Sequence, residues 1–123
     1  MGIRSERGAG GVLAVGIVFT LVSVAAVAVL GMAFAAAARS VAAAADLVAV
    51  SGAQARAKGD DACAEARRIA ARNDVEVSDC QVAGDTIDFV VEVKVRRAIG
   101  WPLPGLPDRV AAVAYAGNVA GVP

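Results

Sequence analysis

The sequence predicts an α+β fold, in which a long N-terminal transmembrane α-helix precedes a small disulfide-stapled head made of a short helix and antiparallel β-strands. Three observations predict it: an uncharged stretch over Gly8–Ala38, a strictly alternating valine-rich stretch after Thr86, and two cysteines in a 123-residue chain. A helix over Gly8–Ala38, called the apolar segment below, exceeds the roughly 30 Å hydrocarbon core of a bilayer at about 1.5 Å per residue. The remainder is short enough for one small domain.

Composition argues against several classes of function. The formal net charge is zero, with 12 Lys+Arg and 12 Asp+Glu, so the charge does not indicate a nucleic-acid partner. Aromatic residues make up 4% of the chain, which disfavours stacking platforms for bases or sugars. The chain has no histidine, the commonest general base and zinc ligand. We therefore expect no enzyme, no catalytic residue, no metal, no cofactor, no nucleic acid and no small-molecule substrate.

The apolar segment organises the chain into four parts. We expect a cytoplasmic basic leader over residues 1–9, a transmembrane helix over 10–38, a helical extension over 39–58 and an extracytoplasmic head over 59–123. Backbone groups in lipid must be satisfied within the segment, which requires a helix. Arg4 and Arg7 favour a cytoplasmic N-terminus. The expected location is the cell membrane, crossed once.

Two kinds of processing compete with a plain anchor. Ala33–Ala35 resembles a small-residue signal-peptidase site, and cleavage there would release a small secreted binding or effector module. A signal's apolar region normally spans about 7–15 residues, so a retained anchor is favoured. The other alternative is processing on the cytoplasmic side, near Gly8, Gly10 or Gly11, with the whole apolar helix kept.

Beyond the apolar segment the chain stays alanine-rich and helix-compatible up to Lys58. We expect one continuous helix from about Gly11 to Ala57, or two helices with a break near Ser40. Helical spacing divides this stretch into two faces. The polar face holds Arg39, Asp46 and Gln54, and the other face holds Val41, Ala45, Val48 and Gly52.

The head begins with a short helix and a first strand. Asp60 is the expected N-cap of a helix over Asp61–Arg72, and Asn73-Asp74 is the expected stop, because Asn tolerates the left-handed conformation. A strand follows around Val75–Val82. Its alternation changes parity in the middle, which predicts a bulge at Ser78-Asp79.

The clearest strand covers Thr86–Arg96, after a turn at Gly84-Asp85. Strict alternation predicts one buried and one wet face of an antiparallel sheet. The buried face is expected to hold Ile87, Phe89, Val91, Val93 and Val95. A proline-rich loop over Ala98–Pro107, a last strand over Arg109–Ala116 and a tail complete the head. The loop residues Trp101, Leu103 and Leu106 either meet the lipid interface or fold over the sheet.

The two cysteines fall on different head elements, Cys63 on the helix and Cys80 on the first strand. In an extracytoplasmic setting a Cys63–Cys80 disulfide is the leading interpretation, and an intermolecular bridge stays open. A loop of this length contributes roughly 3 kcal/mol in the loop-entropy model. That is comparable to the whole net stability of a small domain.

The order of these features resembles a known family, the actinobacterial TadE-like proteins found beside helicase and secretion genes. They are relatives of the TadE and TadG pseudopilins of the tight-adherence (Flp) pilus. The likeness extends from the basic leader through the end of the alanine-rich helix and the two-cysteine pattern to the valine strand. Its residues are Arg7, Gly8, Ala45, Asp46, Leu47, Asp61, Cys63, Ala66, Ile69, Ala70, Asn73, Cys80, Val82, Gly84 and Asp85.

The resemblance implies a minor pilin or pseudopilin inserted by its N-terminal helix. Such a protein is a structural accessory of Flp pilus assembly or of a related secretion system, and its partners are other pilin-like or Tad membrane subunits. Pilins usually carry a glutamate near the start of the apolar helix. No acidic residue lies between Ala9 and Ala45, so the resemblance favours a membrane accessory over a major filament subunit.

Overall fold

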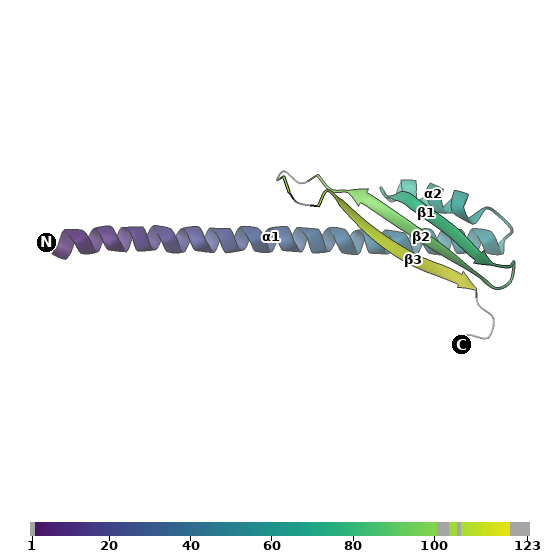
Figure 1. Ribbon diagram of the computed structural model, residues 1–123, viewed down its shortest axis with the longest axis horizontal. Coiled ribbons are helices and arrows are strands. Elements are labelled where there is room, and N and C mark those ends of the chain that lie inside the picture. Colours follow the sequence, from purple (N-terminus) through teal and green to yellow (C-terminus); the bar gives the residue numbers. More distant parts are fainter. Residues whose placement is uncertain (1, 101–103, 106, 119–123) are drawn as a thin grey trace. The chain divides into compact units, whose positions relative to one another are not determined.

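The computed structural model describes residues 2–100, 104–105 and 107–118, with side chains described from Gly8 onward. Its elements in chain order are α1 (Gly2–Ala57), α2 (Ala62–Arg72), β1 (Glu76–Gly84), β2 (Phe89–Ala98) and β3 (Arg109–Asn118) (Figure 1). The chain divides into two compact units, Met1–Ala36 and Ala37–Pro123. The second is called the packed unit below. A long apolar helix, a short helix and an antiparallel sheet are thus confirmed.

The helix α1 is a single element that begins before the expected Gly11 and has no break near Ser40. Within the packed unit it buries one face at spacings of three and four residues, as helical periodicity requires. The buried residues are Val41, Ala44, Ala45, Val48, Ala49, Gly52 and Ala55. The opposite residues Arg39, Asp46 and Gln54 are exposed, so the predicted division into two faces is confirmed.

The N-cap of α2 is Asp61, not the expected Asp60. The Asp61 Oδ1 atom accepts hydrogen bonds from the backbone N–H groups of Cys63 (3.0 Å) and Ala64 (3.1 Å). Asp60 caps the other helix instead. Its backbone N–H donates a hydrogen bond to the carbonyl of Ala55 at 2.8 Å, at the C-terminal end of α1. Two adjacent aspartates offer the same capping chemistry, and the preceding turn decides between them.

The helix α2 ends at Arg72, and the predicted stop at Asn73-Asp74 is confirmed. Asp74 takes the left-handed conformation, with a φ of 56°, whereas Asn73 has a φ of −109°. The Asn73 side chain instead donates from Nδ2 to the carbonyl of Ile69 at 2.8 Å, which satisfies one of the last helical acceptors. Both residue types tolerate the left-handed region, so their order alone does not decide which of them adopts it.

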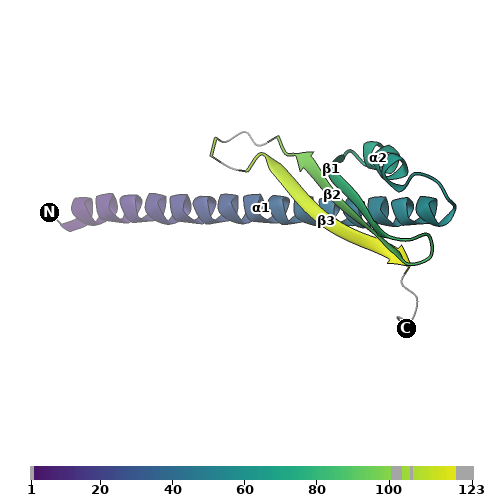
Figure 2. The ribbon, with the colours of Figure 1, turned by 45° about the vertical axis from the view of Figure 1, so that its right-hand side comes forward.

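The three strands form one antiparallel sheet in the order β1-β2-β3 (Figure 2). The central strand β2 buries Phe89, Val91, Val93 and Val95, each no more than 3% exposed, as the alternation predicts. These side chains join those of α1 and α2 in one hydrophobic cluster. The cluster therefore lies on one face of the sheet, under both helices, and the other face holds the polar residues of β2.

The strand β2 starts at Phe89 and not at Thr86, so Ile87 is not part of the core and is 67% exposed. The turn explains the shift, because Asp85 Oδ1 accepts the N–H groups of Ile87 and Asp88, each at 2.7 Å. These two bonds lower the pKa of Asp85. Gly84 has a φ of 103°, and a Cβ there would lie 2.1 Å from the Asp88 carbonyl oxygen.

The predicted bulge in β1 is confirmed. Val77 lies opposite Val95, and the register then shifts so that Asp79 lies opposite Lys94. The last strand β3 continues to Asn118, beyond the expected end at Ala116, and pairs with β2 without a register shift. The predicted loop residues Trp101, Leu103 and Leu106 lie outside the described residues.

Candidate functional site

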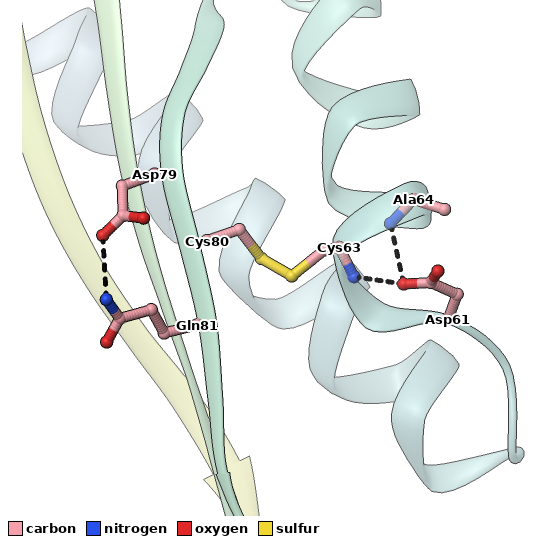
Figure 3. The surroundings of a disulfide bond; sticks show 6 residues. All are labelled: Asp61, Cys63, Ala64, Asp79, Cys80 and Gln81. Carbon is pink, nitrogen blue, oxygen red and sulfur yellow. Dashed lines mark hydrogen bonds between the residues drawn. A yellow bond between two sulfur atoms is a disulfide. The ribbon is translucent and has the colours of Figure 1, made fainter.

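A Cys63–Cys80 disulfide joins α2 to β1, with the two Cα atoms 5.9 Å apart (Figure 3). This confirms the leading interpretation of the two cysteines as an intramolecular pair. Both residues are half-buried, and Cys80 packs against the hydrophobic cluster. The bond therefore belongs to the structure of the packed unit, since reactive cysteines need an exposed thiolate.

Two local features bring the cysteines together. Capping by Asp61 fixes the first turn of α2, where Cys63 lies. The bulge between Val77 and Asp79 resets the parity of β1, so that Cys80 lies opposite Val93 and on the buried face of the sheet. Without the extra residue, period-two alternation would direct Cys80 toward the wet face.

A second cross-link is made by Arg97, which sequence reasoning did not single out. Its Nη2 donates to the carbonyl of Asn73 (2.7 Å), its Nε to the carbonyl of Asp74 (3.0 Å) and its Nη1 to Ser40 Oγ (2.8 Å). One guanidinium thus joins β2, the C-terminal end of α2 and α1. Five fixed donors make arginine suited to this task, and a cation is favourable at a helix C-terminus.

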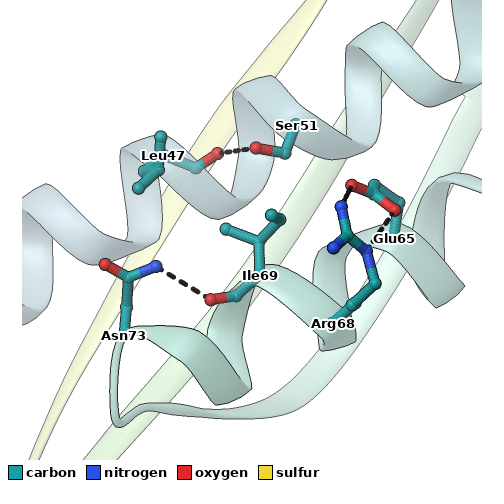
Figure 4. A network of polar contacts seen from close by, with 6 residues as sticks. All are labelled: Leu47, Ser51, Glu65, Arg68, Ile69 and Asn73. Atoms are coloured by element: carbon teal, nitrogen blue, oxygen red, sulfur yellow. Dashed lines mark hydrogen bonds and ion pairs between the residues drawn. The ribbon is translucent and has the colours of Figure 1, made fainter.

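The contact between α1 and α2 depends on Gly52, which the sequence analysis placed on the same helical face as Val41 and Val48. A Cβ at Gly52 would lie 3.1 Å from the Ala62 carbonyl oxygen and 3.4 Å from Val91 Cγ1. Figure 4 shows the same contact further along, where Ile69 of α2 points toward α1. The available signal was the position of Gly52 on the same face as Val41 and Val48.

The N-terminal part of α1 presents apolar side chains outward in every direction. Its larger apolar residues from Val12 to Val29 are 52–76% exposed. The hydroxyls of Thr20 and Ser23 donate to the carbonyls of Gly16 and Phe19, both at 2.8 Å. All polar groups here can thus be satisfied within the helix, as a lipid-facing helix requires. By length and composition, this helix is a candidate membrane span or signal anchor.

The expected leader-processing glycines lie on the exposed surface of the same helix. A Cβ at Gly8, Gly10 or Gly11 would meet no atom within 4 Å, so packing does not require glycine at any of the three. Processing near these residues stays a prediction.

The packed unit has a polar surface hollow of about 560 Å³ between the end of α1 and the start of α2. Charges of both signs line it, and Arg68 donates from Nε to Glu65 at 2.9 Å, a bond that lowers the pKa of Glu65. Among the described residues, no group of three His, Cys, Asp or Glu side chains is placed to hold a metal ion.

The chain was also compared with known proteins. No protein-family model matches it, and no curated protein or solved structure is significantly similar to it. What the chain does must therefore be argued from the apolar segment, the disulfide and the packed unit themselves.

Proposed function

We propose that this chain is a TadE-like, pilin-type membrane protein that acts as a structural accessory of Flp pilus assembly or of a related secretion system. The apolar segment anchors it in the cell membrane, with the N-terminus in the cytoplasm. The packed unit is presented outside, where it contacts other pilin-like or Tad membrane subunits.

The observation that carries this proposal is the exposure of the apolar segment. Side chains such as Val12 and Phe19 are 76% and 73% exposed. Soluble proteins rarely leave a contiguous apolar surface of this extent uncovered, so lipid is the solvent that suits it. A long apolar helix joined to a small α+β unit is also the arrangement that the resemblance implies.

The disulfide supports an extracytoplasmic packed unit. Disulfides persist in oxidising compartments and are rare in the cytosol. The Cys63–Cys80 bond joins two core elements of the packed unit, so the unit is suited to an oxidising space. This agrees with a cytoplasmic N-terminus, because a single span places its two ends on opposite sides.

A secreted module is the second candidate, and one observation favours it. The compact unit begins at Ala37, and the first fully buried residue is Val41. Cleavage after Ala35 would therefore remove none of the buried residues of the packed unit. Such a product would be a small soluble binding or effector module.

Sequencing the N-terminus of the mature protein, together with alkaline carbonate extraction of membranes, separates these functions. An intact N-terminus, or one near Gly11, on a carbonate-resistant chain supports the membrane accessory. A start near Ala36 on a soluble chain contradicts it and supports the secreted module. Co-purification with Tad membrane subunits then tests the assembly role, and a chain that purifies alone from intact membranes would count against that role.

A further inference from the structure

Five arginines gather at one end of the packed unit. Arg97 defines this end, because its side chain donates hydrogen bonds to Ser40, Asn73 and Asp74 at 2.7–3.0 Å. Arg96 precedes Arg97 in the chain, and Arg39 and Arg72 directly precede its partners Ser40 and Asn73. Arg109 pairs across the sheet with Ala98, the residue after Arg97. The five, called the arginine cluster below, are Arg39, Arg72, Arg96, Arg97 and Arg109.

The cluster is only partly neutralised. Glu76 accepts a hydrogen bond from Arg96 at 3.1 Å, and this bond, with the charge of Arg109, lowers the pKa of Glu76. Asp74 and Asp108 are the other carboxylates at this end. Three of the arginines are exposed and make no side-chain hydrogen bond to the described residues: Arg39, Arg72 and Arg109. A surface hollow of about 230 Å³ lies beside Arg96, Arg97 and Arg109.

The opposite end of the packed unit has the opposite charge. The β1–β2 turn contributes Asp85 and Asp88, and the turn before α2 contributes Asp60 and Asp61. Arg56 and Lys58 are the basic residues there. Positive charge is therefore concentrated at the end that holds Ser40, although the whole chain has a formal net charge of zero.

The basic end is also the end where the packed unit joins the apolar segment. The uncharged stretch stops at Ala38, and Ser40 follows two residues later. At about 1.5 Å per helical residue, Ser40 lies roughly 3 Å from the last uncharged residue. The headgroup layer of a bilayer is about 5–8 Å thick on each side, so an anchor seated with Ala38 at the edge of the hydrocarbon core would bring Ser40 to the depth of lipid phosphates.

We propose that the arginine cluster binds the phosphate groups of anionic lipids and holds the packed unit against the membrane surface. The planar guanidinium matches phosphate oxygens in pairs, and basic residues beside a span are drawn to anionic headgroups. This inference rests on the membrane anchoring proposed above. An acidic protein segment is the competing ligand, and the test includes it.

The test uses the full-length chain in nanodiscs of phosphatidylcholine with a minor share of phosphatidylglycerol. After transfer to neutral detergent and washing, mass spectrometry measures the ratio of the two lipids retained per protein. The test variant carries Arg39→Gln, Arg72→Gln and Arg109→Gln. A matched control removes three charges elsewhere, with Lys58→Gln, Arg67→Gln and Lys94→Gln.

We expect the wild-type chain and the control to retain phosphatidylglycerol in several-fold excess over its share, and the test variant to lose that excess. In the wild-type chain, the excess should also fall between about 0.05 and 0.5 M salt, which needs no variant to fold. No excess in the wild type, or equal losses in the two variants, would overturn the inference. Wild-type binding to soluble polyglutamate with no lipid preference would assign the cluster to an acidic protein and also overturn it.

Carbonate extraction of cell membranes that contain the wild-type chain separates this inference from the anchoring. A chain that resists extraction but shows no lipid preference contradicts lipid binding by the arginine cluster and leaves the membrane anchoring intact. A wild-type chain that carbonate removes contradicts the membrane anchoring on which the inference rests.

Discussion

The two parts of α1, one in the apolar segment and one in the packed unit, are built from similar residues but differ in how far those residues are exposed. In the apolar segment Val12 and Val22 are 76% and 62% exposed, whereas Val41 and Val48 in the packed unit are fully buried. Alanine and valine have the same helix propensities in both places, so propensity does not explain the difference. The sheet covers one face of the second part, whereas the large side chains from Val12 to Val29 are exposed.

An apolar helix can obtain apolar surroundings in two ways. In the packed unit the protein supplies the apolar surroundings, and the helix has one buried face with polar residues such as Asp46 opposite. In the apolar segment no face is polar, so we expect its surroundings to be apolar on all sides. A substitution that introduces charge should therefore affect folding in one part and membrane insertion in the other.

The largest effect is expected from Val22→Asp combined with Val24→Asp in the apolar segment. A carboxylate near the centre of a spanning helix costs about 2.5–3.5 kcal/mol, so two cost roughly twice that. We expect the double variant to shift strongly from the carbonate-resistant to the soluble fraction. Val22→Leu with Val24→Leu is the matched control. Equal retention of the two double variants in membranes would contradict a lipid environment.

In the packed unit, Val48→Asp should destabilise by about 4 kcal/mol or more, because it buries a carboxylate without a partner. Val50 is two residues away and 45% exposed, so Val50→Asp is the control and should change stability little. Pulse proteolysis of the full-length chain in detergent measures both. A Val48→Asp protein as resistant as Val50→Asp would show that the packed unit does not use this face of α1.

Loss of the disulfide should have the next largest effect, about 3 kcal/mol for a loop of this length. We expect Cys63→Ser to lower both the amount of protein recovered and its resistance to protease, and the effect should be confined to the packed unit. Cys80→Ser should behave alike, and the double variant should be no worse than either. Unchanged recovery and protease resistance would exclude the bond as a major source of stability.

The smallest effect is expected at the helix cap. Asp61→Ala removes the acceptor of two backbone N–H groups and should cost about 1 kcal/mol. Asp60→Ala leaves both bonds intact and serves as the control, since Asp60 uses its backbone and not its side chain. Thermal unfolding measures the stability of both variants. A larger loss of stability for Asp60→Ala than for Asp61→Ala would show that Asp61 is not the N-cap.

Regular elements were predictable from the sequence, together with the C-terminal ends of α1 and α2, whereas several other ends were not. Alternation identified the core of β2, and a change of parity located the bulge before Cys80. The alternation predicts a start at Thr86 because Ile87 fits it, but the Asp85 turn delays pairing until Phe89. Strand and cap boundaries depend on which of several equivalent polar groups closes a turn, and pattern alone does not decide that.

Tertiary contacts were the other part that sequence reasoning missed. Arg97 binds Ser40, a residue 57 positions away, and such a pairing has no local signal. Gly52 of α1 lies close to α2 and β2, a contact that arises only where those elements meet. The cysteine pair was predictable for the opposite reason, since two cysteines in one short chain leave a single intramolecular pairing.

Cell fractionation combined with alkylation of thiols before and after reduction tests both environments, that of the apolar segment and that of the packed unit, at once. We expect the chain, with its apolar segment retained, in the carbonate-resistant membrane fraction, with Cys63 and Cys80 protected from alkylation until a reductant is added. A full-length chain in the cytosol with both thiols free to react would contradict both the lipid environment of the apolar segment and the oxidising environment of the packed unit.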